Sequence, residues 1–200
     1  MKVVGLTGGI GTGKSAAAEL LVRRGLPVID ADKAARAVQA AGSQGLAELA
    51  SEFGSGILTG TGDLDRQALA AQAFGDPERL ARLNAIVHPR VRAWMAERQR
   101  ELEERGERVV VLSIPLLYEA RGAEGFSAVM VIYAPRATQL RRLVEQRGMT
   151  PADAEARIAA QLPIEEKRLL TPYVIDNSGP LDRLAAEVDR VWSQVAASLA

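Results

Sequence analysis

The stretch Gly8-Gly9-Ile10-Gly11-Thr12-Gly13-Lys14-Ser15 decides the fold class of this chain. It fits the pattern G-x-x-x-x-G-K-[ST], in which glycines let the backbone turn several N–H groups toward one phosphate anion. The apolar run Val3 to Leu6 precedes it, and the Ala- and Leu-rich segment Ala16 to Arg24 follows it. This order predicts a buried strand, a phosphate-binding loop (P-loop) and a helix whose N-terminus faces the anion.

Two side chains at the end of this loop have predicted roles in nucleotide binding. Lys14 is expected to reach the β- and γ-phosphates of ATP from an open, solvent-filled site, and the Ser15 hydroxyl is expected to hold Mg²⁺. The alternative is a glycine-rich turn that matches the pattern by accident. The strand before the loop and the helix after it argue against that alternative.

The composition is that of a globular protein. The chain has 200 residues, 48% hydrophobic and 25% charged, which is enough for one α/β domain with an insertion. Lys+Arg and Asp+Glu both number 25, and without a basic excess we expect no binding to nucleic acid or anionic membranes. The chain has no cysteine, no stretch of membrane-spanning length and no signal peptide at its start, so we expect a cytoplasmic protein.

An acidic pair follows the second predicted strand, Leu26 to Ile29. Asp30 and Asp32 open an Ala-rich helix that carries Arg36. Ligands of open α/β sheets bind beyond the carboxyl ends of the strands, so both carboxylates are expected beside the P-loop. Capping of the helix N-terminus is the alternative, and it suits Asp30 better than Asp32.

The segment from Gly42 to Arg105 is almost wholly helical in pattern. His88-Pro89 is expected to interrupt it, because a residue before proline avoids the helical region. We therefore predict one helix that ends at Val87 and a second from Pro89 to Glu104. Such a block is too long for a plain crossover and predicts an inserted substrate-binding subdomain. His88 is the only histidine, and a solvated or capping imidazole remains the alternative to a binding role.

Three more buried strands are predicted at Val109 to Ile114, Ala128 to Tyr133 and Tyr173 to Ile175. Pro115 to Glu119 lies at the carboxyl end of the first of them. Many P-loop proteins place a magnesium-binding aspartate at the end of such a strand, but this chain has Ser113 there, so we assign no metal ligand to that position.

Arginines gather on the short helices that follow the fourth strand. Arg142, Arg147 and Arg157 lie on helices separated by prolines. Short, proline-broken helices with cations predict a mobile lid over phosphates. A solvated helix face is the alternative.

Taken together, the motifs resemble the dephospho-CoA kinase family over nearly the whole chain. The P-loop alone indicates only a superfamily, whereas the combination in this order is specific. The motifs that carry the resemblance are Gly5 to Ser15, Asp30 to Asp32 with Ala35-Arg36, Leu83-Asn84, His88-Pro89 with Val91-Arg92, Pro115 to Glu119, Gln139-Leu140 with Arg142, Ala156 to Ile158 with Gln161, and Val174 to Gly179.

The resemblance implies an α/β, three-layer P-loop kinase with a five-stranded parallel sheet, a helical acceptor-binding insertion and a helical lid. It implies a nucleotide-binding core over residues 1–30, 108–135 and 171–200, an acceptor subdomain over 31–107 and a lid over 136–170. The implied reaction moves the γ-phosphoryl group of ATP to the ribose 3′-hydroxyl of dephospho-CoA, the last step of coenzyme A synthesis, with Mg²⁺ and in a protein expected to be a monomer.

The resemblance also implies the roles of single residues. Asp32 is the implied base, with Lys14 and the lid cations Arg142 or Arg147 as catalytic partners. The family usually has arginine four residues after Arg142, where this chain has Gln146 beside Arg147, so the phosphate-binding cation is open. The implied ATP-binding residues are Gly9, Ile10, Gly11, Thr12, Gly13, Lys14, Ser15, Ala16, Asp176 and Asn177. The implied acceptor-binding residues are Thr7, Asp32, Arg36, His88, Arg92, Pro115, Leu116, Leu117 and Glu119.

Three other functions compete with this interpretation. The nearest is another P-loop kinase that acts on a different small molecule or a nucleotide. A GTPase-like switch would need a guanine-reading Asn-Lys-x-Asp string, which the chain lacks. A non-enzymatic ATP-binding module gives no reason for Asp32 beside the P-loop.

Overall fold

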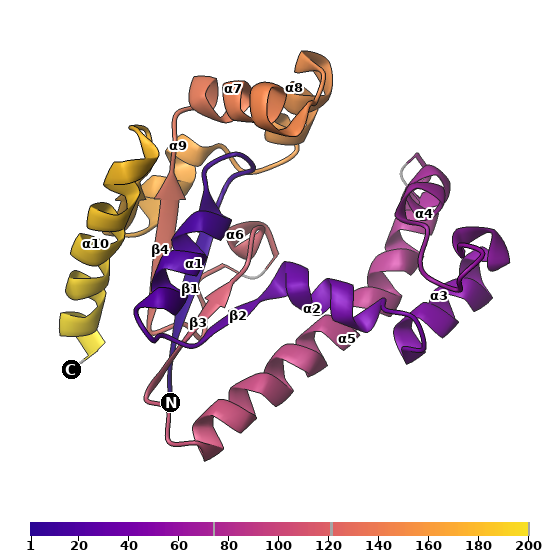
Figure 1. The fold of residues 1–200 in the computed structure, drawn as a ribbon, viewed down its shortest axis with the longest axis horizontal. Coiled ribbons are helices and arrows are strands. Elements are labelled where there is room, and N and C mark those ends of the chain that lie inside the picture. The colour runs from indigo at the N-terminus through magenta and orange to yellow at the C-terminus, as the bar shows by residue number, and fades with distance from the viewer. Residues whose placement is uncertain (74, 121, 200) are drawn as a thin grey trace. The chain divides into compact units, whose positions relative to one another are not determined.

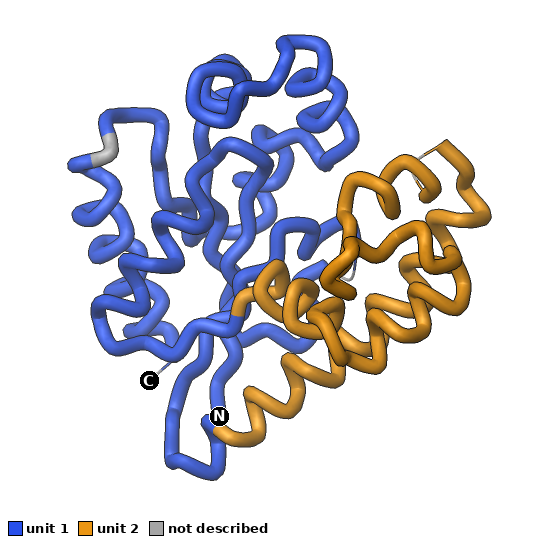
Figure 2. Tube along the Cα trace, turned by 45° about the vertical axis from the view of Figure 1, so that its right-hand side comes forward, with its two compact units in different colours: residues 1–29, 102–200 blue, residues 30–101 orange. Residues whose placement is uncertain are grey.

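The computed structural model describes residues 1–73, 75–120 and 122–199, and the chain forms two compact units. Unit 1 comprises residues 1–29 and 102–200, and unit 2 comprises residues 30–101 (Figure 2). The segment 136–170, predicted as a lid, clusters with unit 1. The functional division into core, acceptor subdomain and lid stays a prediction.

A five-stranded parallel sheet in the order β2-β3-β1-β4-β5 forms the centre of the core, which confirms the predicted α/β fold class (Figure 1). β1 pairs in parallel with both β3 and β4, and β4 pairs with β5. The carboxyl ends of these strands therefore meet at one edge. The strands are β1 (Lys2–Gly8), β2 (Val28–Asp30), β3 (Val109–Ser113), β4 (Ala128–Tyr133) and β5 (Tyr173–Asp176).

Side chains of β1 and β4 alternate between two covered faces of the sheet, as the period of two requires. Val4 and Met130 belong to the main core with residues of helices α1 (Lys14–Arg23) and α10 (Leu184–Leu199). On the other face, Val131 packs with Ile164 of helix α9 (Ile164–Lys167). Burial on both faces explains why these strands are continuous apolar runs.

Helices of unit 1 cover these faces and extend beyond the carboxyl end of β4, where Figure 1 shows α7 and α8. Their bounds are α1 (Lys14–Arg23), α6 (Leu117–Ala120), α7 (Arg136–Arg147), α8 (Pro151–Ala159), α9 (Ile164–Lys167) and α10 (Leu184–Leu199), with 3-10 turns η2 (Arg168–Leu170) and η3 (Leu181–Arg183).

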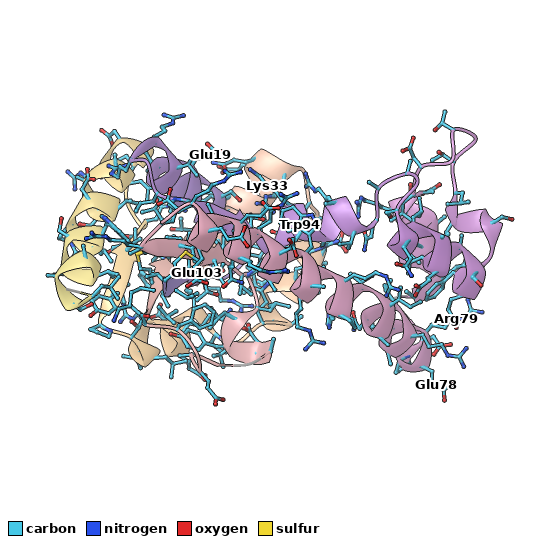
Figure 3. All side chains as sticks on the ribbon, turned by 90° about the horizontal axis from the view of Figure 1, so that it is seen from below. Glu19, Lys33, Glu78, Arg79, Trp94 and Glu103 are labelled. Carbon is cyan, nitrogen blue, oxygen red and sulfur yellow. The ribbon has the colours of Figure 1, made fainter. Side chains whose placement is uncertain are left out.

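Unit 2 is helical and has its own apolar core. Leu49 and Ile57 are fully buried, and they pack with apolar residues of the neighbouring helices. Figure 3 shows Glu78 and Arg79 at the start of its longest helix, where both side chains are exposed. The elements are α2 (Ala31–Val38), α3 (Gln44–Phe53), η1 (Ser55–Ile57), α4 (Arg66–Ala73) and α5 (Pro77–Glu104).

The predicted break at His88-Pro89 is wrong, because α5 continues through Pro89 to Glu104. Pro89 has no N–H for the carbonyl of the preceding turn, which normally weakens a helix. Here the Arg90 side chain donates a hydrogen bond to the Ile86 carbonyl at 2.7 Å and pairs with Glu48 of α3. Val87 and Val91 pack into the unit 2 core on either side of the proline. Tertiary packing therefore outweighs the local preference of the proline.

Candidate active site

The P-loop connects β1 to α1 and folds back on itself. The Thr12 N–H and hydroxyl both donate to the Gly9 carbonyl, at 3.2 and 2.8 Å. α1 begins at Lys14, so Ser15 and Ala16 lie in its first turn, where backbone N–H groups have no helical partner. The predicted ATP-binding residues from Gly9 to Ala16 thus form one continuous loop and helix N-terminus, a ready anion site.

Gly13 shows why the loop needs glycine at its end. Its φ of +97° lies in the left-handed region, and a Cβ there would stand 2.2 Å from Nδ2 of Asn177. Asn177 is 2% exposed, and the same Nδ2 donates to the Thr12 carbonyl at 2.7 Å. A side chain at Gly13 would therefore strain the backbone and displace the contact between the P-loop and the end of β5.

We expect Gly13→Ala to weaken ATP binding by about tenfold or more, because a misplaced loop amide loses a charge-assisted hydrogen bond to phosphate. Isothermal titration with a non-hydrolysable ATP analogue measures this loss. Gly60→Ala is the matched control, since a Cβ at Gly60 meets nothing within 4 Å. ATP affinity within twofold of the wild type in Gly13→Ala would contradict the proposed role of the loop.

Lys14 is buried, with 8% of its surface exposed, so the expectation of an open site around it is wrong. Its Nζ donates to Oγ of Ser113 at 2.7 Å. Ser113 ends β3, which is the neighbour of β1 in the sheet. The serine at this strand end therefore holds the lysine amine at the carboxyl edge of the sheet, a contact that the sequence did not reveal.

Arg142 of α7 joins three parts of the site. Its guanidinium donates to the Asn177 carbonyl at 2.9 Å and to the carbonyls of Gly11 and Thr12 at 3.4 and 3.3 Å. Burial, followed by the neighbouring Arg141 cation, lowers the pKa of Arg142, yet a guanidinium keeps its charge at neutral pH. These bonds connect α7 to the P-loop and to the end of β5.

Arg147 lies in the last turn of α7 and is exposed. It stands five residues after Arg142, which on an α-helix turns it about 140° away from that residue. The structure therefore brings Arg142 to the P-loop and leaves Arg147 at the far end of the helix.

The loop after β3 is attached to β1. The fully buried Thr7 donates from Oγ1 to the Pro115 carbonyl at 3.0 Å. Leu117 is fully buried, whereas Leu116 is 44% exposed. Thr7 thus supports the predicted acceptor loop from the sheet side, and Leu116 is the apolar side chain that the loop presents.

The predicted acceptor residues of unit 2 lie on two helices. The Asp30 carboxylate accepts from the N–H groups of Asp32 and Lys33, at 2.8 and 3.1 Å, so Asp30 caps α2, which was the alternative role considered for it. Asp32 and Arg36 are four residues apart on α2 and share one face. His88 and Arg92 have the same spacing on α5, and all four side chains are exposed.

The side chains of the site suit a Mg²⁺ ion that takes most of its ligands from the phosphate oxygens of the nucleotide. Among the described residues there is no group of three or more His, Cys, Asp or Glu that could hold a metal. Mg²⁺ commonly takes few protein ligands together with substrate phosphate oxygens, and the Ser15 hydroxyl in the first turn of α1 is an oxygen ligand of the right kind.

Within the described chain, no helix is long and apolar enough to cross a membrane.

Comparisons with known proteins agree over nearly the full length. A family model described as dephospho-CoA kinase matches residues 2–183. The dephospho-CoA kinase of Anaeromyxobacter dehalogenans is 46% identical over 195 residues, covering 98% of this chain and 92% of that protein. A crystal structure from Thermus thermophilus has a TM-score of 0.83 at 37% identity, covering 100% and 98% of the two chains. The dephospho-CoA kinase from Campylobacter jejuni has a TM-score of 0.66 at 25% identity, covering 97% of each.

Proposed function

The chain belongs to the dephospho-CoA kinase family, and from this premise we propose which of its residues carry out the reaction. It transfers the γ-phosphoryl group of ATP to the ribose 3′-hydroxyl of dephospho-CoA. The observation that carries the site assignment is the P-loop from Gly9 to Ser15, which lies between β1 and α1 inside the matched region.

On the nucleotide side, N–H groups of the P-loop and of the first turn of α1 bind the phosphates, other than those of Ile10 and Thr12, which donate to Gln161 and Gly9. Lys14 neutralises charge on the β- and γ-phosphates. Asp176 and Asn177 border the adenine, supported by the bond that ties Asn177 to the P-loop. Ser15 holds Mg²⁺, which when bound supplies positive charge to the phosphate oxygens.

On the acceptor side, Asp32 faces the 3′-hydroxyl, with Arg36, His88 and Arg92 as the binding partners on unit 2. The capping of α2 by Asp30 supports this assignment, because it leaves helix capping to the other carboxylate of the pair. Pro115, Leu116 and Leu117 border the acceptor from unit 1.

Phosphoryl transfer asks a protein mainly for positioning and charge stabilisation in a dry site. Asp32 accepts a hydrogen bond from the 3′-hydroxyl and orients its oxygen toward the γ-phosphorus. As the new O–P bond forms, the bond between the γ-phosphorus and the β,γ-bridging oxygen breaks, and ADP leaves with that oxygen. The proton of the hydroxyl passes to the Asp32 carboxylate. Lys14 balances the negative charge on the phosphate oxygens throughout the transfer.

Of the two lid arginines, we propose that Arg142 carries the larger share of charge stabilisation, because its guanidinium already lies against the P-loop. Arg142→Ala is expected to lower kcat by ~10-fold or more, the direction of removed transition-state stabilisation. Steady-state kinetics with both substrates saturating measures the change. Arg141→Ala, an exposed neighbour on the same helix, is the matched control.

Arg147→Ala distinguishes the two arginines, and we expect it to have the smaller effect. A larger loss of kcat in Arg147→Ala than in Arg142→Ala would reverse this assignment. If both single variants and the double variant keep normal kcat, neither arginine stabilises the transition state, and Arg157 becomes the next candidate.

A panel of acceptors with ADP release as readout tests the proposed site against other small-molecule kinases. We expect turnover with dephospho-CoA and little with shikimate, gluconate or nucleoside monophosphates. A faster rate with any of these would contradict the acceptor assignment. We also predict that the protein is a monomer in the cytoplasm, that it depends on Mg²⁺, and that it binds neither nucleic acid nor membranes.

A further inference from the structure

An ion pair between a buried lysine and a partly exposed glutamate lies at the base of the predicted lid. Lys167, the last residue of α9, is 0% exposed, and its Nζ lies 2.7 Å from Oε1 of Glu119 in α6. Apart from this ion pair, the described residues offer the ammonium group no hydrogen-bond partner. A buried cation is costly unless it is paired, so the position of Lys167 depends on this carboxylate.

Glu119 contacts both ends of the segment that carries Lys167. The same Oε1 accepts a hydrogen bond from the Leu162 N–H at 3.1 Å. Between these two points, Ile164 is 6% exposed and packs with Val131 and Tyr133 of the sheet. One carboxylate therefore connects α6 to the start and to the end of the segment from Leu162 to Lys167.

This connection closes a series of contacts around the P-loop. Gln161 directly precedes the segment, and its Oε1 accepts from the Ile10 N–H at 2.8 Å. At the other end of the β3 loop, Thr7 of β1 donates to the Pro115 carbonyl at 3.0 Å. The loop from Pro115 to Glu119 is thus held at its start by the sheet and at its end by α9.

We propose that Glu119 and Lys167 are a pair of positioning residues that fix the Pro115–Glu119 loop for binding dephospho-CoA. In this proposal Glu119 acts through its contacts with Lys167 and Leu162, in place of the direct acceptor contact that the resemblance implied. The inference rests on the proposed function, in which this loop borders the acceptor. Besides the bond from Ile10 to Gln161, the P-loop has bonds to Arg142 and Asn177 that do not involve this segment. We therefore expect loss of the pair to act mainly on the acceptor and to leave ATP binding nearly unchanged.

The test is a double-variant cycle with Lys167→Met, Glu119→Gln and the two combined. We expect KM for dephospho-CoA to rise by about tenfold in each single variant, because a loop displaced by a fraction of an ångström misplaces the acceptor. KM for ATP is expected to stay within about twofold. In the double variant, KM for dephospho-CoA should be no higher than in the more strongly affected single variant, because the pair acts as one unit. Glu166→Gln, an exposed neighbour on α9, is the control.

Rates are divided by the concentration of folded enzyme, obtained by titration with an ATP analogue, so that kcat refers to folded molecules only. KM does not depend on the enzyme concentration, so lost stability alone leaves both KM values unchanged. Should Lys167→Met fail to fold, Lys167→Arg replaces it: the retained cation is expected to keep KM for dephospho-CoA near wild type while Glu119→Gln raises it. Additive effects in the double variant, equal rises in both KM values, or a rise in Glu119→Gln with none in folded Lys167→Met would overturn the proposal. In the replacement experiment with Lys167→Arg, a normal KM for dephospho-CoA in Glu119→Gln would overturn it. Absence of dephospho-CoA turnover in the wild type would instead contradict the proposed function.

Discussion

Lys14→Met is expected to lower kcat by ~10²–10³-fold, as the loss of one preorganised charge on a developing anion commonly does. A charge-assisted contact to phosphate contributes ~1.5–3 kcal/mol in binding, and more in a closed transition state. Methionine is the informative replacement because Lys14 is buried, so the aliphatic stem must be kept while the amine is removed. The variant also removes the donor to Ser113.

Pre-steady-state mixing of ATP with excess dephospho-CoA measures the transfer step in this variant, and thermal unfolding measures its stability. Lys2→Met, an exposed lysine at the opposite end of β1, is the matched control for loss of a charge. Wild-type turnover in folded Lys14→Met would remove the P-loop lysine from the mechanism.

Asp32→Asn is expected to lower kcat with dephospho-CoA by at least ~100-fold, because asparagine keeps the size of aspartate but cannot accept the proton of the hydroxyl. Removal of a general base commonly costs 10²–10⁴-fold, roughly 3–5 kcal/mol of barrier. A loose transition state favours the low end of that range, since the alcohol proton departs late. ATP affinity is expected to stay within a few fold of wild type.

Asp30→Asn is the matched control, two residues away. Asp30 caps α2 through its Oδ1, and asparagine caps a helix about as well as aspartate, so its kcat is expected to stay near wild type. If Asp32→Asn turns over within ~10-fold of wild type, Asp32 is not the base. If Asp30→Asn shows the larger loss, the roles of the two carboxylates are exchanged.

The features that could be predicted from the sequence are those encoded locally. The strands β1 and β4 are buried on both faces, so they are continuous apolar runs and easy to identify. The P-loop is defined by glycines whose backbone angles and close contacts exclude side chains, as at Gly13. The cap of α2 at Asp30 likewise depends only on neighbours in sequence.

The features that could not be predicted depend on contacts between distant residues. The continuous helix through Pro89 could not be predicted from local preferences, because it depends on an ion pair between Arg90, the next residue of α5, and Glu48 of α3. The bond from Lys14 to Ser113 joins the start of α1 to the end of β3, and the ion pair of Lys167 with Glu119 joins two short helices. Helical phase alone separates Arg142 from Arg147, but only the packing of α7 shows which of them meets the P-loop.

The central claim is that the P-loop of this chain delivers the ATP γ-phosphoryl group to one hydroxyl, with Asp32 facing it. The most direct measurement incubates the enzyme with dephospho-CoA and ATP labelled in the γ-phosphate, then locates the label in the product by mass spectrometry and ³¹P NMR. We predict one labelled phosphate on the ribose 3′-oxygen for each ADP formed. With Asp32→Asn, we predict almost no labelled product over the same reaction time. Label on another oxygen, ADP release without labelled coenzyme A, or the same product yield with Asp32→Asn would contradict the account.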